Sequence, residues 1–210
     1  MIGAWWSWLA AVALYLLFRL WYDNWRGPLR DDEVAHYMAL LENSPGVEHT
    51  DLLGLRRFLE EDDGREFLMA NLVRLKPEPL IHPHTGATVK ARELMQAYAK
   101  GFLATMLRLG GHPYIVTRKV GGYIDAWDAG ADPGWTIAAT MRYRSRRDCM
   151  RLATNPRFLD AYPLKVLAVA NTISFPTTVL MSGTLRPRTA VALLLALAAA
   201  LVHLASLLLA

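Results

Sequence analysis

The sequence predicts an α+β domain with a transmembrane helix on each side of it. Two observations carry this prediction. Every charged side chain lies between Arg19 and Arg188, so both ends of the 210-residue chain are apolar. Between these ends the hydrophobic period changes from helical to alternating and back, as it does where helices and strands share one domain.

The first apolar run covers residues 1–22 and is interrupted only by Arg19. A helix of about 20 such residues crosses the roughly 30 Å core of a bilayer, and the tryptophans near both of its ends are typical of interfacial belts. A cleaved signal peptide is the alternative, but basic residues before the run and a small-residue cleavage site after it are both missing. We therefore expect a retained transmembrane helix over residues 1–22 and a second one over residues 189–210.

The basic residues beside the two runs predict the direction in which the chain crosses the membrane. Arg26 and Arg30 follow the first run, and Arg186 and Arg188 precede the second. Because Lys and Arg accumulate on the cytoplasmic side, we expect a bacterial inner-membrane protein with two spans, a cytoplasmic middle domain and exoplasmic termini. Membrane lipid is then a partner. The net charge of +4 is mixed with acids along the chain, so we expect no nucleic-acid partner.

Residues 23–64 are expected to form a helical linker region. Helices are predicted over residues 31–45 and 51–64, the second capped by Thr50 and ended by Gly64.

The elements of the domain over residues 65–182 follow from their periods and their turn residues. The first strand is apolar on both faces, which is typical of a strand covered on both sides. Gly110 and Gly111 end the helix that follows, and Ser145 caps a later helix that breaks at Asn155-Pro156. The expected elements are a strand over 65–77, a loop over 78–88, a helix over 91–109, strands over 112–122 and 135–144, a broken helix over 146–169 and a strand over 173–181. This β-α-β-β-α-β order is ferredoxin-like, with two helices on one face of an antiparallel sheet.

Three stretches carry a resemblance to a known superfamily. "FLMANLVRLKP", "GGHPYIV" and "RYRSRRDCMRLATNPRFLDAYPLKVLAVANT" resemble the dimeric α+β barrel superfamily over residues 50–178. The resemblance implies a homodimer formed through the open face of the sheet. Its members include cofactor-free monooxygenases, isomerase-like and haem-handling enzymes, and proteins with no known activity, so the fold alone does not select a function.

Four residues are candidates for a ligand pocket inside the domain. Asn71 is a polar residue in the middle of an apolar strand, where it serves either as a ligand anchor or as a structural amide. Tyr98, His112 and Trp135 are the other candidates, with packing as their alternative role. His82 and His84 lack a third metal ligand, so we expect no metal site, and no set of residues has the pattern of a catalytic group.

His203 is the one ionisable side chain in the second apolar run. Such a residue is by default a functional hypothesis. Three roles stay open: packing or hydrogen bonding to a neighbouring helix, no role, or ligation of a pigment or haem. The small residues Ala196, Ala199 and Ala200 favour close helix packing. The stretch "RPRTAVALL...AAALVH" resembles purple-bacterial light-harvesting α polypeptides, which implies bacteriochlorophyll or haem at His203.

Two functions follow from these expectations. The first is a non-catalytic accessory or assembly subunit of an inner-membrane complex, photosynthetic or redox, with other membrane subunits as partners. The alternative is a membrane-anchored small-molecule enzyme of cofactor-free monooxygenase type. A filled domain interior favours the subunit, and a pocket able to hold a hydrophobic ligand favours the enzyme.

Overall fold

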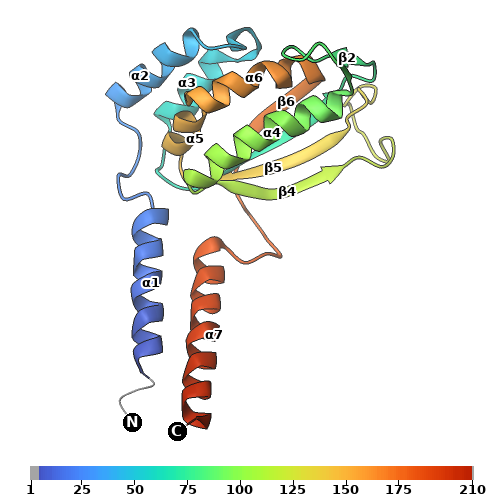
Figure 1. Cartoon of the computed structure of the whole chain (residues 1–210). Helices are drawn as coiled ribbons and strands as arrows, with labels where there is room; N and C mark the ends of the chain where they lie inside the picture. Colours follow the sequence, from blue (N-terminus) through green and yellow to red (C-terminus); the bar gives the residue numbers. More distant parts are fainter. Residues whose placement is uncertain (1–4, 210) are drawn as a thin grey trace. The chain divides into compact units, whose positions relative to one another are not determined.

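The computed structural model describes residues 5–209, which divide into two compact units (Figure 1). One unit comprises Arg26–Thr178, and the terminal segments on either side of it form the other. The elements in chain order are α1 (Trp6–Tyr22), α2 (Asp31–Glu42), the short 3-10 helix η2 (Val47–His49), α3 (Leu52–Glu60), β1 (Phe67–Leu75), β2 (Leu80–Ile81), β3 (Thr88–Val89), α4 (Ala91–Arg108), β4 (His112–Arg118), β5 (Ile137–Tyr143), α5 (Arg146–Ala153), α6 (Pro156–Ala168), β6 (Val169–Thr177) and α7 (Pro187–Leu208).

A four-stranded antiparallel sheet with the order β4-β5-β1-β6 forms the centre of Arg26–Thr178. β1 pairs on both edges: Asn71 lies opposite Ala139 of β5 and opposite Ser174 of β6. Helices cover one face of the sheet, which explains the apolar side chains of β1 on that face, and the pairing of both edges satisfies the backbone of β1. The predicted α+β class and its antiparallel four-stranded sheet are confirmed.

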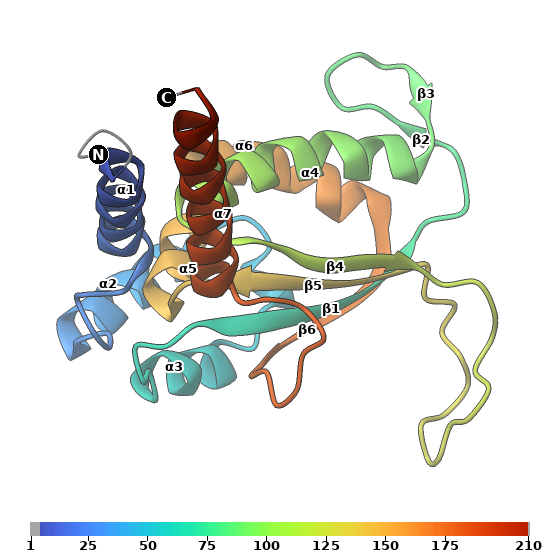
Figure 2. The ribbon, with the colours of Figure 1, turned by 90° about the horizontal axis from the view of Figure 1, so that it is seen from below.

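Helices α4 and α6 pack beside each other on one face of the sheet (Figures 1 and 2). Leu94 and Met106 of α4 are fully buried in the core between the layers. Val34 of α2 and Leu59 of α3 belong to the same hydrophobic core. The helices expected in the linker region of residues 23–64 therefore lie in the same compact unit as the sheet.

An ion pair ties α2 to α5 inside this unit. Arg147 donates from Nε and Nη2 to the two carboxylate oxygens of Glu33, at 2.9 and 2.8 Å. The same guanidinium donates to the backbone oxygens of Gly27 and Pro28 at 2.9 and 2.8 Å. With Arg147 only 4% and Glu33 only 13% exposed, the pair is largely withdrawn from water. The hydrogen bond from Arg147 lowers the pKa of Glu33 to about 2.

Three element boundaries differ from the sequence-based expectation. Asp51, not Thr50, caps α3, because its carboxylate accepts a 3.0 Å hydrogen bond from the backbone of Gly54. β6 begins at Val169, because Val169 already pairs with Leu75 across a register shift. Residues 78–88, expected as a loop, contain most of a small ribbon formed by β2 and β3.

The other unit is a pair of antiparallel helices, α1 and α7. Ser7 donates a 3.1 Å hydrogen bond to the backbone oxygen of Ala199, and the rings of Trp5 and His203 lie edge to face at 5.4 Å. At the opposite end, Arg188 of α7 donates to Asp23 at 2.7 Å.

α7 is the one helix in residues 5–209 that is long and apolar enough to cross a membrane. α1 is apolar but has 17 residues, and residues 1–4 of the expected first span lie outside the described part of the chain.

Candidate functional site

A cavity of about 340 Å³ lies between the sheet and the helices that cover it. This volume is at the lower end of the roughly 300–1,000 Å³ found for small-molecule pockets. Most of the lining is apolar. It consists of Asn71, Val73, Pro113, Val116, Ile137, Ala139, Met141, Tyr143 and Thr172 from the sheet, Met95, Tyr98, Ala99, Phe102 and Leu103 from α4, Cys149, Leu152 and Ala153 from α5, and Phe158 and Lys165 from α6.

Strand alternation and helical spacing bring these side chains together. On β5, Ile137, Ala139 and Met141 share the face that looks toward the helices, because residues two apart point to the same side. On α4, Tyr98 and Phe102 are four residues apart and their rings stack at 5.7 Å. The aromatic part of the lining is therefore preformed by regular secondary structure.

Asn71 reaches the cavity, but its amide is already used within the sheet. Its Nδ2 donates to the backbone oxygens of Met69 at 2.8 Å and Ala139 at 3.2 Å. Its Oδ1 accepts a 2.8 Å hydrogen bond from Ser174. Because both amide hydrogens have partners, Asn71 can offer a ligand only a remaining acceptor site on Oδ1.

The acidic groups around the cavity are held in their neutral forms. Burial raises the pKa of Cys149 to about 12 and raises the pKa of Tyr98 and of Tyr143 above their ordinary values. A thiol is a weak nucleophile when it is protonated, so Cys149 lacks the environment of a reactive cysteine. These groups supply apolar surface and neutral polar atoms rather than charge.

Lys165 brings a charged group to this lining. It is half-buried on α6, and burial lowers the pKa of its ammonium group. Its Nζ lies 5.5 Å from the ring centre of Tyr162 and 6.0 Å from that of Tyr98. Within residues 5–209 no hydrogen bond or ion pair of Lys165 is found. The lysine is thus held by two aromatic faces at distances typical of weak cation–π contacts.

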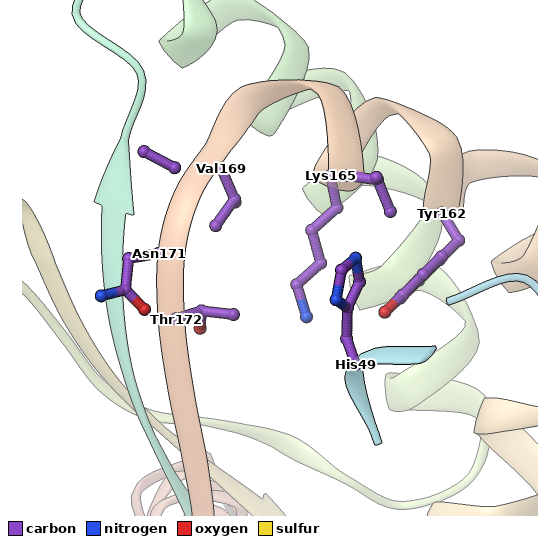
Figure 3. A pocket seen from close by; sticks show the side chains of 8 residues that line it. His49, Tyr162, Lys165, Val169, Asn171 and Thr172 are labelled. Carbon is purple, nitrogen blue, oxygen red and sulfur yellow. The ribbon is translucent and has the colours of Figure 1, made fainter. Parts of the chain in front are cut away.

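Lys165 and Thr172 also line a second pocket of about 290 Å³. Figure 3 shows Lys165 and Tyr162 reaching from α6 toward His49, with Thr172 on the other side of the lysine ammonium group. Asn171 of β6 completes the polar part of this pocket. Because Lys165 and Thr172 line both hollows, the apolar cavity and the polar pocket adjoin at these two residues.

The four predicted pocket residues do not all meet at one place. Asn71 and Tyr98 line the cavity, whereas His112 and Trp135 do not. His112 pairs with Arg142, and the alternation of β5 turns that pair away from the helices. Trp135 precedes β5, and its Nε1 donates to the hydroxyl of Tyr123 at 3.1 Å instead.

Lys165 was not among the residues predicted from the sequence. It lies in an apolar stretch of α6, beside the buried Leu164 and two residues after Pro163, which sits inside the helix. A lysine flanked by apolar residues on a helix that covers a sheet is the signal that points to it, since such a side chain must run along the core before it reaches water.

His203 and the alanines of α7 lie along the contact with α1. Ala199 is buried, while Ala196, Ala200 and His203 are half-buried. The face of α7 one turn before His203, which a flat macrocycle would require, is occupied by Ser7 of α1. Ligation of a pigment or haem therefore requires α1 to leave this position, and the helix-packing role requires no rearrangement.

Within residues 5–209 no group of three or more His, Cys, Asp or Glu side chains is arranged to hold a metal ion. The rings of His82 and His84 lie 5.7 Å apart, and the backbone amide of His84 donates to Nδ1 of His82 at 3.2 Å.

Comparisons with known proteins identify a fold but no family. No protein-family model matches the chain, and no curated protein matches it. The chain is similar to RPA0582, a protein of unknown function from Rhodopseudomonas palustris, with 21% identity and a TM-score of 0.53 over 63% of this chain and 95% of that one. It is also similar to a structure of methylated RPA0582, with 22% identity and a TM-score of 0.54 over 64% of this chain and 95% of that one. At such identities the likeness shows a shared α+β sheet fold alone.

Proposed function

We propose that this protein is a membrane-anchored small-molecule-binding protein whose ligand occupies the cavity between the sheet and α4, α5 and α6. The observation that carries the proposal is the cavity itself: about 340 Å³ of largely apolar, aromatic-lined space between the sheet and the helices that cover it. The interiors of protein domains are normally close-packed. An apolar space that the side chains leave open is therefore a place where an apolar ligand can bind.

The proposal favours the small-molecule alternative over a purely structural subunit. Its catalytic version is an enzyme of cofactor-free monooxygenase type, one of several activities among the dimeric α+β barrels that the sequence resembles. Because Cys149 and Tyr98 are neutral, they are poor nucleophiles, which argues against nucleophilic catalysis in the cavity. Ligand binding is therefore the function that the geometry supports best. Oxygen consumption with a bound phenolic compound would test the catalytic version.

A matched pair of variants on β5 tests the binding function. Ala139→Leu places three additional carbons in the cavity, whereas Ala138→Leu adds the same atoms to the opposite face of the sheet. The full chain in lipid nanodiscs is titrated calorimetrically with 2-naphthamide, a neutral aromatic probe, against empty nanodiscs. Wild type and Ala138→Leu should bind with similar affinity, and Ala139→Leu should bind at least about tenfold more weakly. Equal binding by all three proteins would refute the proposal.

The anchor in this proposal is the helix pair α1 and α7, with two spans, a cytoplasmic domain and exoplasmic termini in a bacterial inner membrane. At 1.5 Å per residue, α7 is about 33 Å long and the described part of α1 about 26 Å, against about 30 Å for a bilayer core. Cysteines introduced near each end of α7 and labelled with an impermeant maleimide in intact cells would test the orientation. Labelling of the Arg186 end from outside would contradict it.

A second candidate function, the accessory or assembly subunit, is favoured by a different surface. In the β4–β5 connection Val120, Ile124 and Trp127 are 92%, 99% and 86% exposed, which is unusual for apolar side chains without a partner. On the open face of the sheet Ile173 and Phe175 are about half exposed, as a homodimer through that face would require. An absorption spectrum of the protein purified from its native membrane, with its partners, tests both the subunit and the cofactor at His203. A pigment or haem band that is lost in His203→Leu would support both the subunit function and the ligation of a cofactor by His203.

A further inference from the structure

We propose that the ligand of the cavity is a small apolar molecule with a single carboxylate group, and that Lys165 is the cation that selects it. This inference rests on the proposed binding function and adds the chemical class of the ligand. It begins from an imbalance of charge: the residues that line the cavity include Lys165 but no Asp or Glu.

The chain itself provides no partner for this charge within residues 5–209. No Asp or Glu is among the described residues that line the second pocket, and the carboxylate of Glu48, next to the pocket residue His49, lies 3.5 Å from Nε2 of that histidine. A cation that is partly withdrawn from water is destabilised unless it is paired, and the two tyrosine rings only weakly compensate for this. A carboxylate placed beside Nζ would restore the pairing.

The place of Lys165 in the two hollows sets the orientation of such a ligand. The lysine borders both the apolar cavity and the polar pocket, so a carboxylate beside it can point toward the pocket while the body of the ligand fills the cavity. Tyr162 can add a second donor, because its hydroxyl has no hydrogen bond to the described chain and burial raises its pKa. Thr172 cannot do so, since its hydroxyl already donates to the backbone oxygen of Leu72 at 2.9 Å.

The test compares two probes of the same shape that differ in charge, 2-naphthoate and 2-naphthamide. The full chain in lipid nanodiscs is titrated with each probe. Wild type should prefer the carboxylate by at least roughly tenfold, the size expected of one charge-assisted hydrogen bond. Lys165→Met, which replaces the cation with an apolar chain of similar length, should lose this preference and keep its affinity for the amide. Lys165→Arg should retain a part of the preference.

A control variant separates local from general electrostatics. Lys90→Met removes the same charge from the exposed residue before α4, and it should leave the preference unchanged. Equal affinity of wild type for both probes, or a preference that survives in Lys165→Met, would overturn the inference and leave the binding function standing. Failure of both probes to bind would overturn the binding function and the inference together.

Discussion

The buried ion pair between Glu33 and Arg147 gives the most quantitative prediction, and the change that tests it is Glu33→Gln. The substitution keeps the shape of the side chain but leaves the buried guanidinium of Arg147 without its carboxylate. Removal of one partner from a buried pair costs about 3–5 kcal/mol of unfolding free energy. The shift of the pKa of Glu33 from 4.5 to about 2 gives a similar value, about 3 kcal/mol at 1.36 kcal/mol per pH unit.

The sign of the pH dependence follows from the direction of this shift. A carboxyl group whose pKa is lower in the folded state stabilises the protein fully above pH 4.5, and it loses this contribution as the pH falls toward about 2. Below that range Glu33 is protonated and resembles glutamine. The difference in stability between wild type and Glu33→Gln should therefore be about 3 kcal/mol at neutral pH and vanish near pH 2.

The assay is urea denaturation of the full chain in a mild detergent, followed by hydrogen exchange of the β1 amides, which report on the domain rather than on the helices α1 and α7. For a domain of about 150 residues the loss corresponds to roughly 6–12 °C in melting temperature. Asp32→Asn is the control, because Asp32 is 70% exposed in its pair with Arg30 and exposed pairs contribute little. A Glu33→Gln variant as stable as the control, or a difference that does not depend on pH, would refute the reasoning.

Three further outcomes are expected. Gly46→Ala should destabilise the domain by about 1–3 kcal/mol in urea denaturation, because Gly46 has a φ of +84° and a Cβ there would lie 2.3 Å from the Tyr162 ring. The control is Gly86→Ala. Gly86 has a φ of +68° but lies in open space, so this variant should show only the smaller conformational cost. Cys149, buried and with its pKa raised to about 12, should react with iodoacetamide at pH 8 only at the rate at which the domain opens, so its labelling should accelerate with urea. Ala199→Leu should overpack the contact between α1 and α7 and weaken it by about 1–3 kcal/mol, measured as faster protease cleavage near the helix ends; unchanged cleavage would contradict that contact.

Sequence periodicity was sufficient to predict the sheet and its covering helices. Buried positions are apolar, and they recur at every second residue in a strand and at every third to fourth residue in a helix. Periodicity was insufficient for boundaries that depend on one competing contact. Thr50 and Asp51 are both good cap residues, and only the folded backbone shows that Asp51 reaches Gly54. The start of β6 was missed for a similar reason, since Val169 pairs with Leu75 across a register shift that no local pattern encodes.

The candidate site was predicted in part for the same physical reason. Asn71 and Tyr98 lie on the faces of β1 and α4 that the spacing of apolar residues indicates, and both line the cavity. The position of His112 depends on the register between β4 and β5, which pairs it with Arg142 and turns it away from the helices. Lys165 was overlooked because a lysine on a helix is ordinarily solvated, and its place beside two hollows depends on the tertiary arrangement of the residues that line them.

The contact between α1 and α7 has a consequence for the unfolded chain. While Ser7 and Ala199 stay packed, the chain between them is closed into a loop, as it would be by a covalent crosslink. Closing this loop of 192 residues removes unfolded-state entropy worth about 5 kcal/mol in the chain-entropy model. A domain excised from its two helices should therefore be less stable than the same domain in the intact chain, even though not one of its own contacts is lost.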